Sequence, residues 1–110
     1  MQTTDPATLQ EITDRITEDP YVVLYLSRPG CGVCTALKPK VLGITGELPE
    51  ARFCHVDLNQ VPEAAGEYSV YTIPAILVFV DRRETIREAR YVSLEDLKNR
   101  MTRLYHLRFE

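Results

Sequence analysis

The sequence contains no tryptophan, only three cysteines and only five glycines among its 110 residues. Three cysteines are an odd number and do not make a disulfide framework, which favours a reducing compartment and predicts a cytoplasmic location. No apolar run reaches the roughly 18 residues that a membrane span needs, and residues 1–6 lack the basic and apolar regions of a signal peptide. The net charge of −3 supplies no basic stripe for repeated phosphate contacts, which argues against nucleic acid as the main partner.

What is present is an ordinary globular composition. Hydrophobic residues make up 45% of the chain and charged residues 26%. At this length one hydrophobic core can form but not two, so residues 1–110 are expected to be a single domain. No repeat, low-complexity tract or linker divides the sequence, and we expect a monomer.

The apolar periodicity predicts elements in the order α, β, α, β, α, β, β, α. Asp5 is the predicted N-cap of the first helix, with Pro6 at its first helical position and an end near Asp19. The predicted strands are 21–26, 52–57, 75–80 and 85–92, the predicted later helices lie near 31–44, 60–68 and 93–104, and 81–84 is a predicted polar turn. Strands 21–26 and 75–80 are continuously apolar, as in a sheet covered by helices on both faces.

The densest chemical signal is the run Cys31-Gly32-Val33-Cys34, between an apolar strand and a helix. A thiol at a helix N-terminus is favoured as thiolate by free backbone N–H groups and the helix dipole. Because the thiolate is the species that attacks disulfides, this placement predicts exchange chemistry rather than a structural cross-link. Cys54 is most simply a small buried residue, and since adjacent Cys54 and His55 point to opposite faces of a strand, no metal site is expected.

Two prolines accompany the cysteine pair. Pro39 lies inside the second predicted helix, where it removes a backbone donor and predicts a kink. Pro74 stands in the run 71–75 (YTIPA), directly before the third predicted strand, and a charged hairpin and a terminal helix follow. With these motifs in this order, residues 7–107 resemble the thioredoxin superfamily. The resemblance implies an α/β, thioredoxin-like fold: a central mixed four-stranded sheet with helices on both faces, with the first strand of thioredoxins apparently missing before Leu9.

The resemblance also implies roles for particular residues. Cys31 would attack a substrate disulfide, and Cys34 would resolve the mixed disulfide. Pro74 would be a cis-proline facing the cysteines, and the backbone of Ile73 would bind an extended substrate segment. The implied substrate-binding residues are Gly30, Gly32, Val33, Ile73, Pro74 and Arg90.

The chain departs from the thioredoxin pattern at five positions. Gly30 stands in place of a tryptophan, Val33 of a proline, Tyr25 of a buried aspartate, Phe53 of its lysine partner and Arg90 of a groove glycine. A tyrosine, with an ordinary pKa near 10, is a poor proton acceptor near neutrality, so resolution by Cys34 is expected to be slower or to rely on water. The added cation at Arg90 predicts a preference for disulfides with acidic neighbours.

The sequence therefore predicts a thiol–disulfide oxidoreductase that reduces protein disulfides, with no bound cofactor and with reducing equivalents from NADPH through a thioredoxin reductase-like donor. Two alternatives stay open. A thioredoxin-fold interaction module could use the cysteine pair as a redox sensor. A glutathione-dependent, glutaredoxin-like protein is the weaker alternative, because the Gly-Gly pair expected after the final strand is replaced at 89–92 by ARYV.

Overall fold

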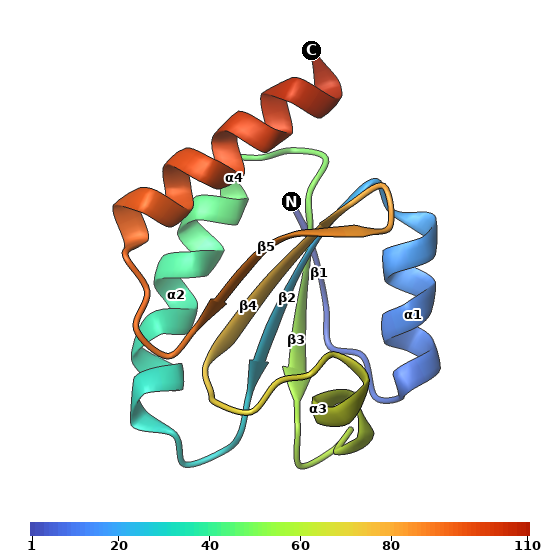
Figure 1. Cartoon of the computed structure of the whole chain (residues 1–110), viewed down its shortest axis with the longest axis vertical. Helices are drawn as coiled ribbons and strands as arrows, with labels where there is room; N and C mark the ends of the chain where they lie inside the picture. The colour runs from blue at the N-terminus through green and yellow to red at the C-terminus, as the bar shows by residue number, and fades with distance from the viewer.

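The computed structural model describes residues 1–110, and a five-stranded sheet forms its centre (Figure 1). The strands are β1 (Gln2–Thr4), β2 (Tyr21–Ser27), β3 (Arg52–Asp57), β4 (Ala75–Val80) and β5 (Arg83–Ala89). They lie in the order β1-β3-β2-β4-β5. β3 is parallel to both β1 and β2, whereas β4 is antiparallel to both β2 and β5. The sheet is mixed, as the sequence predicted.

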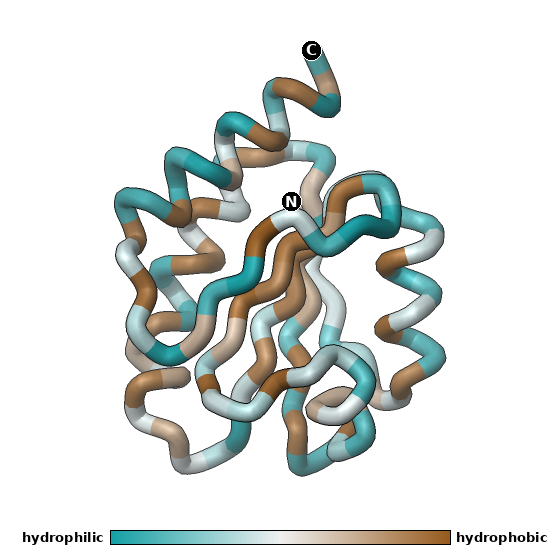
Figure 2. Tube along the Cα trace, viewed as in Figure 1, coloured by the Kyte–Doolittle hydropathy of each residue, from teal (hydrophilic) through white to brown (hydrophobic).

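Helices cover both faces of this sheet. They are α1 (Leu9–Glu18), α2 (Gly32–Gly46), α3 (Glu63–Glu67) and α4 (Leu94–Phe109). Figure 1 shows α2 and α4 together on one side, and α1 and α3 on the other. The side chains of β2 alternate between two separate cores: Val22, Leu24 and Leu26 pack with α1, and Tyr21, Val23 and Tyr25 with α2 and α4. Burial on both faces explains the apolar run of this strand, and the middle of the sheet is mostly brown in Figure 2.

The predicted four-stranded sheet was one strand short. Residues Gln2–Thr4 form an edge strand, β1, in which Thr3 pairs with Phe53 of β3. The backbone N–H of Gln2 donates to the carbonyl of Ala51 (3.0 Å), and the Arg52 guanidinium donates to the Thr4 hydroxyl (2.9 Å). A polar three-residue strand at a sheet edge carries no apolar alternation, because contacts with β3 rather than burial hold it in place.

The predicted start of α1 was also wrong. Thr8, not Asp5, is the N-cap: its hydroxyl accepts from the N–H of Glu11 (3.1 Å), and the Glu11 carboxylate accepts from the N–H of Thr8 (3.1 Å). This reciprocal pair is a capping box, which satisfies two free helix donors and outcompetes the Asp5-Pro6 start.

Other boundaries moved by a few residues. β5 spans 83–89 rather than 85–92, because Asp81 and Arg82 (φ 48° and 72°) complete the hairpin turn within two residues. α3 spans 63–67 rather than 60–68.

Ser93 caps α4 as predicted, its hydroxyl accepting from the Asp96 N–H (3.3 Å). The buried face of α4 comprises Leu97, Met101 and Tyr105, while Leu94 and Leu104 are only half-buried. α2 continues through Pro39, where the kink stays a prediction. None of the helices combines the length and the apolar character that a membrane-spanning segment needs.

Candidate active site

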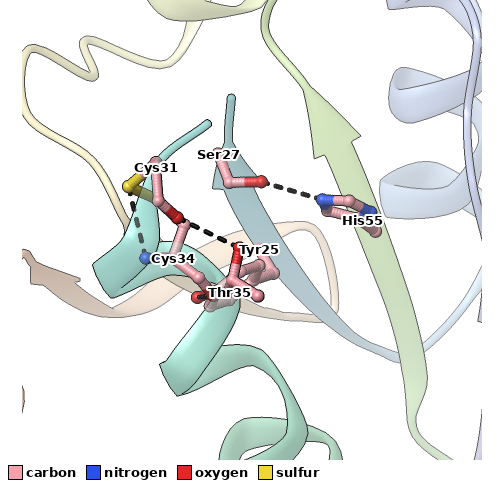
Figure 3. Close-up of a disulfide and its surroundings, with 6 residues drawn as sticks. All are labelled: Tyr25, Ser27, Cys31, Cys34, Thr35 and His55. Carbon is pink, nitrogen blue, oxygen red and sulfur yellow. Dashed lines mark hydrogen bonds between the residues drawn. A yellow bond between two sulfur atoms is a disulfide. The ribbon is translucent and has the colours of Figure 1, made fainter. Parts of the chain in front are cut away.

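The cysteine pair lies where β2 passes into α2 (Figure 3). Cys31 and Cys34 form a disulfide with their α-carbons 5.3 Å apart. Cys31 is the N-cap of α2, and its sulfur accepts from the backbone N–H of Cys34 (3.2 Å). Cys31 is half-buried, whereas Cys34 is only 3% exposed. On reduction, the N–H group and the dipole of this 15-residue helix favour the thiolate at Cys31, the more accessible sulfur.

The turn before the pair needs a glycine. Gly30 has a φ of 81°, in the left-handed region that side chains rarely adopt. A tryptophan at this position, as in the thioredoxin pattern, would be strained in this backbone conformation. Gly32 and Val33 are exposed, Val33 to 52%.

Sheet pairing places Pro74 beside this turn. Ala75, the first residue of β4, pairs with Leu26 near the end of β2, so the Ile73–Pro74 bond lies where β2 leads into the cysteine loop. That bond is cis. The Pro74 carbonyl accepts from the Arg90 N–H (2.7 Å), while the backbone N–H and carbonyl of Ile73 have no partner within the chain.

Tyr25 cannot replace a buried carboxylate as proton acceptor. It is fully buried, its ring stacks on Phe53 (6.0 Å between centroids), and its hydroxyl donates to the carbonyl of Cys34 (2.5 Å; Figure 3). Burial raises the pKa of Tyr25 to about 12. The phenol therefore stays protonated near neutrality and holds the first turn of α2 against β2.

A polar cluster behind Cys34 was not predicted. Ser27 and Cys34 line a pocket of about 420 Å³ together with His55 and Lys38. The Ser27 hydroxyl lies 2.8 Å from Nε2 of His55 (Figure 3), and the Lys38 ammonium lies 3.3 Å from Nδ1. Burial first, and then the Lys38 charge, lower the pKa of His55 below 6.5, so the imidazole is neutral at neutral pH. One sequence signal was available: Lys38 is four residues after Cys34, on the same helix face.

The third cysteine lies on the opposite face of the sheet. Cys54 is fully buried in the core with α1, and burial raises the pKa of its thiol to about 12. Its predicted role as a small core residue is confirmed. His55, the next residue, faces the pocket instead, and the structure contains no group of three or more His, Cys, Asp or Glu side chains that could hold a metal ion.

Exposed side chains lie in the two segments next to Pro74: the residues just before it and the loop that its carbonyl binds. Arg90 is exposed, has a φ of 63° and lies over the ring of Tyr91 (5.5 Å to the centroid). It forms no ion pair, unlike Arg87 and Arg100, which bind Glu84 and Glu88. Tyr91 and Tyr71 are 84% and 85% exposed. Sequence reasoning did not consider Tyr91, because exposure has no periodic signature in a loop.

Comparison with known protein sequences shows the family of this chain. The sequence model of the thioredoxin family matches residues 3–103. The thioredoxin-like protein YdfQ of Bacillus subtilis is 37% identical over 99 residues, covering 90% of this chain and 88% of that protein. The thioredoxin-like protein YusE of the same organism is 32% identical over 100 residues, covering 86% and 92%.

The fold also matches solved structures. The crystal structure of thioredoxin from Trypanosoma brucei brucei superposes with a TM-score of 0.85 at 16% identity, covering 96% of this chain and 92% of that one. Such a likeness shows the fold alone, and the family assignment rests on the sequence match. The chain belongs to the thioredoxin family and is a thiol–disulfide oxidoreductase, with the pair Cys31–Cys34 as its redox-active disulfide.

Proposed function

We propose that this protein reduces disulfides in protein substrates, with Cys31 as the attacking thiolate and Cys34 as the resolving thiol. The observation that carries this proposal is the asymmetry of the pair: Cys31 caps α2 and is half-buried, while Cys34 lies one helical turn deeper and is 3% exposed. The unpaired backbone groups of Ile73 support binding of an extended segment beside the cysteines.

The exchange has two steps, and each breaks one S–S bond as it forms another. The Cys31 thiolate attacks one sulfur of the substrate disulfide and releases the other as a thiolate, which takes up a proton. The Cys34 thiolate then attacks Cys31 in the mixed disulfide, and the second substrate sulfur leaves with its electron pair. The substrate gains two electrons and the enzyme is left with its Cys31–Cys34 disulfide. We propose that an NADPH-dependent, thioredoxin reductase-like donor returns the electrons in the cytoplasm, and that the protein works as a monomer without a bound cofactor.

A Cys34→Ser variant is expected to stop after the first attack and to stay covalently attached to its substrates. The serine hydroxyl at position 34 cannot displace a thiol, so mixed disulfides at Cys31 accumulate. The measurement is affinity capture from a cell extract followed by release with dithiothreitol. The matched control is the double variant Cys31→Ser/Cys34→Ser, which should capture nothing. Equal capture by both variants would contradict attack by Cys31, and turnover of insulin without any captured species would contradict the two-step order.

We further propose that Arg90 directs the protein toward disulfides with acidic neighbours. The Arg90 guanidinium has no acidic partner in the chain. The backbone N–H of the same residue donates to the Pro74 carbonyl, which places Arg90 next to the cis-proline. Charge complementarity of this kind mainly raises the rate of encounter with an acidic segment.

Arg90→Gly is expected to remove this preference and to stabilise the fold by about 1 kcal/mol, since a left-handed φ is costly for arginine and not for glycine. Arg90→Ala is the matched control: it removes the same charge but keeps a side chain at φ 63°, so preference is lost without the gain in stability. Rates on paired acidic and basic peptide disulfides, together with urea unfolding, separate the two effects. An unchanged ratio of the rates in both variants would refute the charge argument.

A further inference from the structure

The Cys34 thiol must lose a proton before it can resolve the mixed disulfide, and no carboxylate replaces the missing acceptor on β2. The Tyr25 phenol stays protonated, and its hydroxyl donates a hydrogen bond to the Cys34 carbonyl. The residue stacked on Tyr25, Phe53, is apolar and has no proton to exchange. The chemistry of resolution therefore depends on the other polar groups around Cys34.

Lys38 is the cation nearest to Cys34 along α2. The two residues are four apart in the helix, so they share one face, and both line the same pocket. Lys38 is half-buried, and it has no carboxylate within ion-pair distance. Its polar contact is with Nδ1 of His55 (3.3 Å). An ammonium has only donors, so Lys38 donates to Nδ1 of His55. The proton of the neutral imidazole is then on Nε2, which donates to the Ser27 hydroxyl.

No carboxylate forms an ion pair with Lys38, although Asp57 lines the same pocket. His55, from β3, is neutral near pH 7 because of its burial and of Lys38 itself. Asp57, also from β3, lines the pocket, but its carboxylate accepts from the N–H of Asn59 (2.8 Å). Asp5, from the segment before α1, lies 4.0 Å from His55 and is 85% exposed, and Arg28, from the loop before α2, adds a second cation at the rim.

We propose that Lys38 is the counter-ion of the Cys34 thiolate, and that His55 and Ser27 hold it in position. Where a buried carboxylate would take the proton from the resolving thiol, this chain stabilises the anion that remains and lets the proton leave through the open, polar pocket to solvent. The Cys34 sulfur then attacks Cys31, and the substrate sulfur departs with the electrons of the broken bond. This inference rests on the proposed role of Cys34 as the resolving thiol.

The test is the titration of Cys34 in the reduced protein, followed by NMR of cysteine labelled with ¹³C at Cβ. Lys38→Gln is expected to raise the titration midpoint by about half to one pH unit, since a nearby cation favours the thiolate. At pH 7, resolution of a mixed disulfide at Cys31 should then slow by about 3- to 10-fold, as the thiolate fraction falls tenfold per pH unit. Lys38→Arg keeps the charge and should keep the midpoint near that of the wild type.

Lys40→Gln is the matched control, because it removes the same charge from the same helix at an exposed position. Its midpoint should stay close to the wild-type value, and a Lys38→Gln shift no larger than this control would overturn the proposal. His55→Asn distinguishes a second possibility. If it slows resolution as much as Lys38→Gln while leaving the Cys34 midpoint unchanged, His55 takes the proton itself and does not act by holding Lys38 in position.

The NMR titration measures Cys34 without any turnover, so its result does not depend on the proposed function. Failure of Cys34→Ser to trap substrates would refute the proposed two-step exchange but not the charge pairing of Lys38 with Cys34. The same spectra report whether each variant is folded, and Lys38→Met, which keeps the apolar stem, replaces Lys38→Gln if the glutamine is not tolerated.

Discussion

Restoring the thioredoxin aspartate through Tyr25→Asp is expected to lower the free energy of unfolding by about 3–5 kcal/mol at pH 8. Position 25 is fully buried between α2 and the sheet, and Phe53, stacked on Tyr25, cannot supply the lysine partner that thioredoxins place there. The aspartate would be an uncompensated charge in a space shaped for a phenol ring, so desolvation and a cavity both destabilise the fold.

The loss should depend on pH in a fixed direction. A buried aspartate without a partner has a raised pKa in the folded state, so the folded protein binds more protons than the unfolded chain above pH 3.9 or so. Stability then falls as pH rises, and the deficit of Tyr25→Asp relative to wild type should be clearly smaller at pH 4 than at pH 8. Urea unfolding at the two pH values measures it.

Tyr25→Phe is the matched control. It removes only the hydrogen bond to the Cys34 carbonyl and should cost about 1–2 kcal/mol with little dependence on pH. It should also leave the pH profile of resolution unchanged, because the phenol takes no part in proton transfer. If the Tyr25→Asp protein were as stable at pH 8 as Tyr25→Phe, the surroundings of position 25 would already solvate a carboxylate, contrary to this prediction.

The strands and helix boundaries that could be predicted from the sequence are those with a strong pattern in their own residues. The apolar runs of β2 and β4 are long and end at turns, so their place in a buried sheet was recoverable from the residues alone. β1 was not recoverable, because its three polar residues are held by backbone pairing to β3, a contact that no pattern within residues 2–4 encodes. The start of α1 failed for a related reason: two capping signals competed, and the reciprocal bonds between Thr8 and Glu11 prevailed.

The site residues likewise fall into two groups: those close in sequence, which could be predicted, and those that only tertiary packing brings together. Cys31 and Cys34 are close in sequence, so their spacing alone predicts their proximity. The contact of Lys38 with His55 joins α2 to β3 across 17 positions, and it exists only because the helix packs on that end of the sheet. The substitution of Tyr25 could be seen in the sequence, but its consequence could not. A phenol that donates to the Cys34 carbonyl is anchored by tertiary packing, which gives it a structural task and moves the proton chemistry elsewhere.

Cys31→Ser is expected to lower the rate of insulin reduction at least about 1000-fold. A serine hydroxyl is not ionised at neutral pH and does not attack a disulfide sulfur. Cys54 cannot take over, because it is fully buried on the opposite face of the sheet and its pKa is about 12. Cys34, at 3% exposure, cannot reach a folded substrate.

The matched control is Cys54→Ala, which removes a thiol of the same chain without touching the pair. It should keep the insulin rate within about twofold while lowering stability by roughly 1 kcal/mol through the small cavity it leaves. Alkylation of the reduced protein by iodoacetamide at pH 7 should modify Cys31 first and leave Cys54 unmodified until the protein is unfolded. A Cys54→Ala variant that lost activity while staying folded would mean that the third cysteine takes part in electron transfer, and the two-cysteine mechanism would then be incomplete.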